Sequence, residues 1–331
     1  MVLTSGDPSS APAGWRRALR LAANVPTPLI FSISLVVAFV LLWRQGALGQ
    51  VGRAARSADV ATVALAFFLY LIGLTLLCLR WHVLVLMAKG TSHLARASEA
   101  FITSVVINYA APIGLAVPAR AALTKRALGL SPAEMGTVGL WEIGADVAVL
   151  SFGGIIWLGI SGGGNTRGMH LPGPALALAL LIVVTGVAVG AYWLLRWQPV
   201  RRRLGAAGSG ILAAPARRPA AALWAFGLSV VYWLLQGIVL WLLLEAVGVD
   251  AQTTLVLGLL SLPVLVGMLS PVPGGAGVRE ALMVVVANRA GVDTAGVLVA
   301  AVSYRVALFA AIPVLYAGVR LWLSRADAVQ P

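Results

Sequence analysis

Long apolar stretches separated by short polar segments run through the whole chain. Six of these stretches carry little or no charge and are long enough to cross about 30 Å of hydrocarbon as α-helices. They cover residues 25–43, 60–79, 136–160, 171–195, 219–244 and 295–319. The pattern therefore predicts an all-α integral membrane protein with six spanning helices.

Two further apolar stretches, residues 98–127 and 252–289, are interrupted by residues that break helices. The first contains Asn108, Pro112, Gly114 and Pro118, and the second contains the run Ser270-Pro-Val-Pro-Gly-Gly-Ala-Gly-Val-Arg-Glu280. Irregular backbone at membrane depth is tolerated only where protein buries it or water fills a cavity, because its N–H and C=O groups cannot face hydrocarbon. Each stretch is compatible with a re-entrant hairpin or with a broken spanning helix.

The distribution of Lys and Arg favours re-entrant hairpins, since these residues accumulate on cytoplasmic loops. With the N-terminus inside and both interrupted stretches re-entrant, most of the 24 Lys and Arg residues fall on the cytoplasmic side, including Arg80 after the second apolar stretch. The order of two spans, a broken segment and a span then occurs twice with opposite orientation. Such an inverted-topology repeat typically places a substrate site between its halves near the midplane.

We therefore expect one polytopic membrane domain over residues 25–325, with a first half of about 25–165 and a second half of about 171–325. Cytoplasmic tails of residues 1–24 and 326–331 flank it. The expected location is the cell membrane, either a plasma or an inner membrane. The printed sequence stops directly after the last apolar stretch, so no soluble catalytic domain is expected.

Composition narrows the function classes. With 60% hydrophobic and 11% charged residues, the chain is far from the roughly 25% charged content of soluble proteins. The net charge of +13 would indicate nucleic acid in a soluble chain, but here the basic residues act as topology signals, and no nucleic-acid partner is predicted. The three His and one Cys show no ligand spacing, so no metal or cofactor is expected. No catalytic residue is predicted either, because the sequence has no nucleophile–base arrangement or phosphate-binding loop.

Several charged side chains fall inside predicted membrane segments. A lone charge at the bilayer centre costs roughly 2.5–3.5 kcal/mol on insertion scales. Pairing or a wet cavity must lower that cost, so we predict one polar cluster between the two halves, with Arg120 as a further cation. An alternative is that the carboxylates only cap helix ends. The charged residues of the predicted cluster are Glu142, Asp146, Arg279, Glu280 and Arg305.

The second broken segment supplies a candidate anion site. The amides of Gly274, Gly275 and Gly277 precede a half-helix, and helix N-termini attract anions. We expect Arg279 and Arg305 to bind a phosphate with these amides. The three carboxylates would then pair the arginines or bind an amine.

These motifs resemble the lysylphosphatidylglycerol synthase transmembrane-region family over roughly residues 25–325. The strongest element is Pro271-Val-Pro-Gly-Gly-Ala-Gly-Val-Arg-Glu280, which is similar to a proline, double-glycine, glycine and glutamate signature of that family. Supporting elements are Asn108, the stretch Arg120–Arg126, the Glu142 and Asp146 pair, and Tyr304-Arg305. The chain departs from the family pattern at Ala116-Val117, where a glycine and an acid are usual, and at Ile143, where an arginine is usual.

The resemblance implies lipid handling, because the membrane part of the full synthase is associated with moving an aminoacylated phospholipid. We therefore expect translocation of a phospholipid, or of a polyprenyl- or hopanoid-linked lipid, through a polar site between the broken segments. Membrane lipids are the expected partners. One alternative is a non-transporting scaffold that recruits a lipid-modifying enzyme through the basic stretch 196–218. The other is a small intramembrane lipid enzyme.

Overall fold

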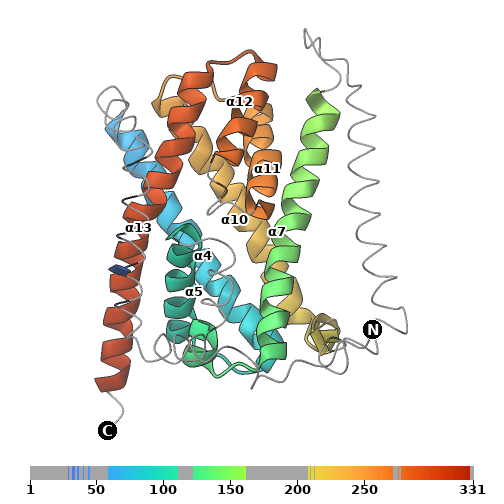
Figure 1. Ribbon diagram of the computed structural model, residues 1–331, viewed down its shortest axis with the longest axis vertical. Coiled ribbons are helices and arrows are strands. Elements are labelled where there is room, and N and C mark those ends of the chain that lie inside the picture. The colour runs from blue at the N-terminus through green and yellow to red at the C-terminus, as the bar shows by residue number, and fades with distance from the viewer. Residues whose placement is uncertain are drawn as a thin grey trace, which may run out of the picture.

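A computed structural model describes residues 59–110, 122–161, 213–270 and 277–328, together with single positions among 29–44 and 208–211 and at 275. Every regular element of these residues is a helix (Figure 1). The all-α prediction is confirmed for this part of the chain.

Four helices are long and apolar enough to cross a membrane. They are α4 (Val60–Lys89), α7 (Pro132–Ser161), α10 (Pro219–Ala246) and α13 (Thr294–Ala328). They match four of the six predicted spans. The predicted span 25–43 is described only at single helical positions, and the span 171–195 lies outside the described residues.

Helix α4 is longer than the apolar pattern predicted. It starts at a capping carboxylate, because Asp59 accepts hydrogen bonds from the amides of Ala61 and Thr62, and it ends at Gly90 with φ 91°. Its 30 residues span about 45 Å. Arg80, which we placed in a cytoplasmic loop, therefore lies inside the helix and is only 3% exposed.

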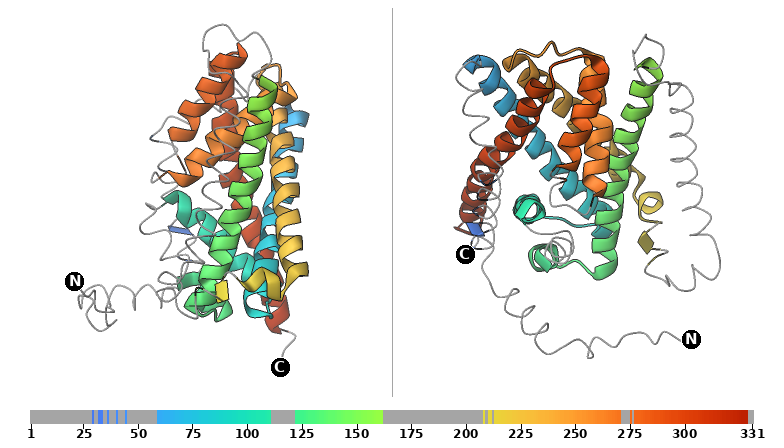
Figure 2. Two further views of the ribbon diagram at one scale, coloured as in Figure 1. Left: turned by 90° about the vertical axis from the view of Figure 1, so that its right-hand side faces the viewer. Right: turned by 45° about the horizontal axis from the view of Figure 1, so that its top comes forward.

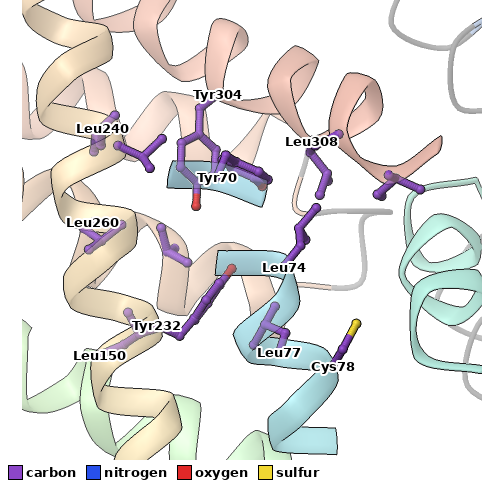
Figure 3. Close-up of a cluster of buried hydrophobic side chains, with 14 of the residues drawn as sticks. Tyr70, Leu74, Leu77, Cys78, Leu150, Tyr232, Leu240, Leu260, Tyr304 and Leu308 are labelled. Carbon is purple, nitrogen blue, oxygen red and sulfur yellow. The ribbon is translucent and has the colours of Figure 1, made fainter. Parts of the chain in front are cut away.

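The core lies where α4, α10 and α13 meet, with α4 packed most extensively against α10. Leucines and tyrosines from these helices interdigitate with residues of α7 and α11 (Thr253–Leu269), as Figure 3 shows. Large apolar side chains on α7 and α10 point away from this core and stay exposed, among them Phe152, Trp224 and Leu234. An apolar outer surface of this kind is suited to contact with lipid tails.

The second interrupted stretch forms two short helices, as the sequence predicted. Helix α11 ends at Leu269, and α12 (Val278–Ala290) begins after the break. Their 17 and 13 residues span about 25 Å and 20 Å, so neither crosses the hydrocarbon alone. The two helices pack against each other in one end of the bundle (Figures 1 and 2).

Both open ends of this α11–α12 hairpin lie at the same end of the molecule. Val249, just before α11, packs against Gly296 in the first turn of α13, just after α12. The closed end of the hairpin, called here the hairpin tip, comprises Gly267, Gly275, Gly277 and the first turn of α12.

The hairpin tip requires close contact between the backbone at Gly275 and the backbone at Gly267 near the end of α11. Gly275 has φ 66°, and a Cβ atom there would lie 2.6 Å from the carbonyl oxygen of Gly267. We predict that Gly275→Ala destabilises the protein by about 2–4 kcal/mol, since it adds left-handed strain to a backbone collision. Thermal unfolding in detergent measures this change. Gly139→Ala is the control: it lies within α7, no described residue is within 4 Å of the added Cβ, and the change should leave stability equal or raise it by up to about 1 kcal/mol, since alanine is the better helix former.

The first interrupted stretch begins at the opposite end of the bundle. Helix α5 (Leu94–Ala110) follows α4 after a short turn and occupies the other half of the molecule from the hairpin (Figure 1). A helix over residues 122–128 then lies near the same end, because Lys89 Nζ donates to the Leu128 carbonyl at 2.7 Å. The connection through Pro112, Gly114 and Pro118 lies outside the described residues.

Candidate functional site

A buried ion pair joins the hairpin tip to α13. Glu280 is the third residue of α12, and its Oε2 accepts a hydrogen bond from the Gly277 amide at 2.7 Å. Its other oxygen, Oε1, lies 2.8 Å from Nη2 of Arg305, and both side chains are largely buried. One carboxylate therefore caps α12 and neutralises a cation of α13.

Arg279 lies beside this pair and is 7% exposed. Its guanidinium carbon is 4.9 Å from the centre of the Tyr304 ring, which is the geometry of a cation–π contact. Its Nε and Nη2 atoms are buried and have no hydrogen-bond partner among the described residues.

Tyr304 connects the hairpin tip to the core. Its hydroxyl donates to Oε1 of the fully buried Gln236 on α10, and its ring meets Tyr70 of α4 edge-on at 5.1 Å (Figure 3). These contacts hold the ring in one orientation. The platform beneath Arg279 is therefore fixed by three helices.

A second polar cluster lies between α4, α7 and α10. Arg80 donates from Nη1 and Nη2 to the two carboxylate oxygens of Asp146, and Nη2 is 3.4 Å from Oε1 of Glu142. Ser229 and Trp233 of α10 complete it: Arg80 Nη1 donates to Ser229 Oγ at 2.9 Å, and Trp233 Nε1 donates to Asp146 at 2.9 Å. We call these five residues the Arg80 cluster.

The two clusters are separate and differ in charge. On α4, Tyr70 contacts Tyr304 beside the hairpin tip, and Arg80 is the centre of the other cluster. These two residues are ten positions apart, which corresponds to about 15 Å along the helix. Among the described residues, the hairpin tip with Arg305 of α13 holds two guanidinium groups and one carboxylate, whereas the Arg80 cluster holds one guanidinium and two carboxylates. Their formal charges are therefore of opposite sign.

The family model for the lysylphosphatidylglycerol synthase TM region matches residues 29–317, which is nearly the whole chain. The chain belongs to this family. No curated protein sequence matches it. Membership associates the chain with membrane lipids and confirms the resemblance inferred from its motifs.

Two glycines of the proline- and glycine-rich run on which the family resemblance was based lie in the hairpin tip, and the structure separates their roles. Gly275 allows the backbone of the tip to pack against Gly267, whereas a Cβ on Gly277 would meet no described residue within 4 Å. Gly277 has φ 82°, so a glycine suits that position conformationally. Gly274 lies outside the described residues.

Other sequence-predicted site residues are placed in different ways. The structure brings Arg279, Glu280, Tyr304 and Arg305 together, as expected. It puts Glu142 and Asp146 with Arg80 in place of the single cluster that we predicted. Asn108 is in the last turn of α5, with its side chain outside the described residues, and Arg120 lies outside them as well.

Sequence reasoning missed Arg80 and Gln236. The run Val83–Met87, separated from Arg80 by two residues, is apolar, and this was the available signal that the helix continues past the arginine. Gln236 lies in the middle of an apolar stretch, and nothing in the sequence indicates its tyrosine partner. Among the described residues, no group of three His, Cys, Asp or Glu side chains could hold a metal ion.

Proposed function

We propose that this protein translocates a membrane lipid, with the hairpin tip as the site for the lipid headgroup. The observation that carries the proposal is the Glu280–Arg305 ion pair, which is buried at the tip of a broken helix in a member of a lipid-associated membrane family. Broken helices supply charged groups and free helix ends at membrane depth, where transporters bind their substrates.

The physical argument rests on the barrier for a headgroup. A polar headgroup cannot enter hydrocarbon without losing its hydration, which costs several kcal/mol for a charged group. Preorganised charges at the hairpin tip would replace that hydration, while the acyl chains stay in lipid beside the apolar faces of α7 and α10. The headgroup would then cross in two shorter steps, one on each side of the tip.

The proposal includes an inverted-repeat architecture with six spans. In it, the α11–α12 hairpin re-enters from one side of the membrane, and the segment that begins with α5 re-enters from the other side. The opposite placement of α5 and the hairpin in the bundle supports this arrangement (Figure 2). The protein would lie in the plasma or inner membrane of the cell. Both of its termini would face the cytoplasm.

Reconstitution in liposomes tests the translocation. Vesicles containing fluorescent phospholipids are treated with a membrane-impermeant quencher, and the loss of protected inner-leaflet signal reports headgroup movement. We expect protein-dependent movement of at least one headgroup class and a decrease of at least tenfold in Glu280→Gln, because the pair at the tip loses its anion. A tenfold decrease corresponds to about 1.4 kcal/mol in the barrier.

The matched control is Glu134→Gln. Glu134 caps α7 by accepting from the Ser131 amide at 2.7 Å, in the same capping position as Glu280, but near the end of a spanning helix. The Glu134→Gln variant should move lipid at the wild-type rate. Movement no faster than in protein-free vesicles across anionic, zwitterionic and polyprenyl lipids would reject the proposal, and chemical conversion of the lipids would indicate an enzyme instead.

A further inference from the structure

The guanidinium of Arg279 has one edge that no described residue uses. Its Nε and Nη2 atoms are buried without a hydrogen-bond partner among these residues, and the side chain is more than nine-tenths buried. A buried charged donor without an acceptor is unfavourable, and such groups in native proteins call for an explanation. An anionic ligand is one that supplies the missing acceptors.

The positions of the two unused nitrogens indicate the shape of that ligand. In an arginine, Nε and Nη2 lie on the same edge of the planar guanidinium, and their N–H bonds point in parallel. This fork matches two oxygens of one phosphate or carboxylate. The flat face of the same group already rests on Tyr304, so its edge is the part left for a ligand.

The first turn of α12 adds further donors. The helix has 13 residues, and the amides of Val278, Arg279 and Glu280 have no carbonyl within α12 to which they can donate. The Gly277 amide is taken by Glu280, but no described residue fills the space beside Gly277, since an added Cβ would meet none of them within 4 Å. A helix N-terminus with open space beside it can accept an anion.

The charges at the hairpin tip favour binding of an anion over binding of an amine. Both oxygens of Glu280 are engaged, Oε2 by the Gly277 amide and Oε1 by Arg305. The carboxylate of Glu280 is therefore already neutralised by Arg305, and an ammonium group at the tip would have to compete with that arginine. The remaining formal charge, that of Arg279, matches the single negative charge of a phosphodiester.

We propose that the hairpin tip binds the phosphodiester of an anionic phospholipid through the Nε–Nη2 edge of Arg279 and the first amides of α12, and that it does not recognise a headgroup amine. This inference rests on the proposed function, since it names the substrate class of the same site. Arg305 is then the partner of Glu280 and positions the tip, whereas Arg279 contacts the substrate.

Binding to the purified full-length protein in detergent tests this assignment separately from transport. Isothermal titration is performed with dihexanoylphosphatidylglycerol, dihexanoylphosphatidylethanolamine, dihexanoylglycerol and inorganic phosphate. We expect phosphatidylglycerol to bind at least as tightly as phosphatidylethanolamine, and dihexanoylglycerol to bind at least tenfold more weakly. Arg279→Gln should weaken phosphatidylglycerol binding at least tenfold, and Arg279→Lys should weaken it less, because a lysine keeps the charge but not the fork.

Arg325→Gln is the matched control, because it removes a guanidinium from the last turn of α13 at about 30 Å along the helix from Tyr304. It should bind as the wild type does. Equal binding of dihexanoylglycerol, a requirement for the amine, or unchanged binding in Arg279→Gln would each overturn the proposal. The lipid selectivity of the wild type decides the question even where a variant fails to fold.

The remaining outcomes identify the source of the phosphate and isolate the transport step. Inorganic phosphate that binds as tightly as phosphatidylglycerol would overturn the assignment to a lipid. Arg279-dependent binding of phosphatidylglycerol in a protein that moves no lipid in liposomes would support this site and reject translocation. Translocation that persists unchanged in Arg279→Gln, with no selective binding, would reject this site alone.

Discussion

Replacing Arg80 with alanine is expected to destabilise the protein by about 3–5 kcal/mol, because the change removes the buried guanidinium that two buried carboxylates contact. Asp146 and Glu142 are 8% and 6% exposed, and Arg80 donates to both. Loss of the guanidinium also removes the hydrogen bond to Ser229. Unfolding in detergent, followed by temperature or by denaturant, measures the effect.

The control for this prediction removes the charge of Arg80 and the charges of both carboxylates in one variant. In the triple variant Arg80→Met, Glu142→Gln and Asp146→Asn, no buried charge is left unpaired, so most of the lost stability should return. Arg320→Ala serves as a second control, since its pair with Glu99 is half exposed on the arginine side and such pairs contribute about 0–1 kcal/mol. A stable Arg80→Ala protein would show that the cluster is not needed for folding.

Replacing Glu280 with alanine is expected to be comparably destabilising, by about 3–5 kcal/mol, because it removes the carboxylate that lies 2.8 Å from the buried guanidinium of Arg305. The same change removes the acceptor for the Gly277 amide at the start of α12, and lost caps typically cost about 1 kcal/mol. Glu280→Gln keeps an oxygen for the cap and loses only the charge. It should therefore be less destabilising than Glu280→Ala in the same unfolding measurement.

A double-mutant cycle separates the ion pair from the cap. In an Arg305→Ala background, Glu280→Ala should lower the free energy of unfolding by much less than it does in the wild type, because the ion pair is already lost. The difference is the coupling energy between the two positions, which we expect to be about 1–3 kcal/mol. Glu134→Ala, which removes a cap at α7 without a buried arginine, should cost about 1 kcal/mol. A coupling near zero would mean that the contact between Glu280 and Arg305 contributes nothing to stability.

The two clusters share the same supporting helices. Helices α4 and α10 carry Tyr70 and Gln236 at the hairpin-tip end, and Arg80 and Ser229 at the other cluster. A substitution in the Arg80 cluster that spares folding can therefore reach the hairpin tip through these helices, or through α7, which packs against α11. The stability and binding measurements on the same variants distinguish the two effects.

Much of the fold was predictable from local features. The four described spans follow from uncharged apolar stretches, since burying backbone polar groups in lipid requires a helix. The break before α12 follows from a cluster of prolines and glycines that disfavours a continuous helix, and the cap at Glu280 agrees with the alternative that carboxylates cap helix ends. The limits of α4 were not predictable in the same way, because Arg80 ended the apolar stretch although the helix continues to Lys89.

The amino-acid sequence by itself determined the membrane character, the four described spans apart from the end of α4, the broken segment and the family. Each of these depends on properties of neighbouring residues along the chain. Only the tertiary structure decided which charges meet: Arg80 pairs with carboxylates 62 and 66 positions away, and Tyr304 bonds to Gln236 across 68. The physical reason is that such contacts depend on the rotation and depth of packed helices, which a one-dimensional pattern of apolar and polar residues does not specify.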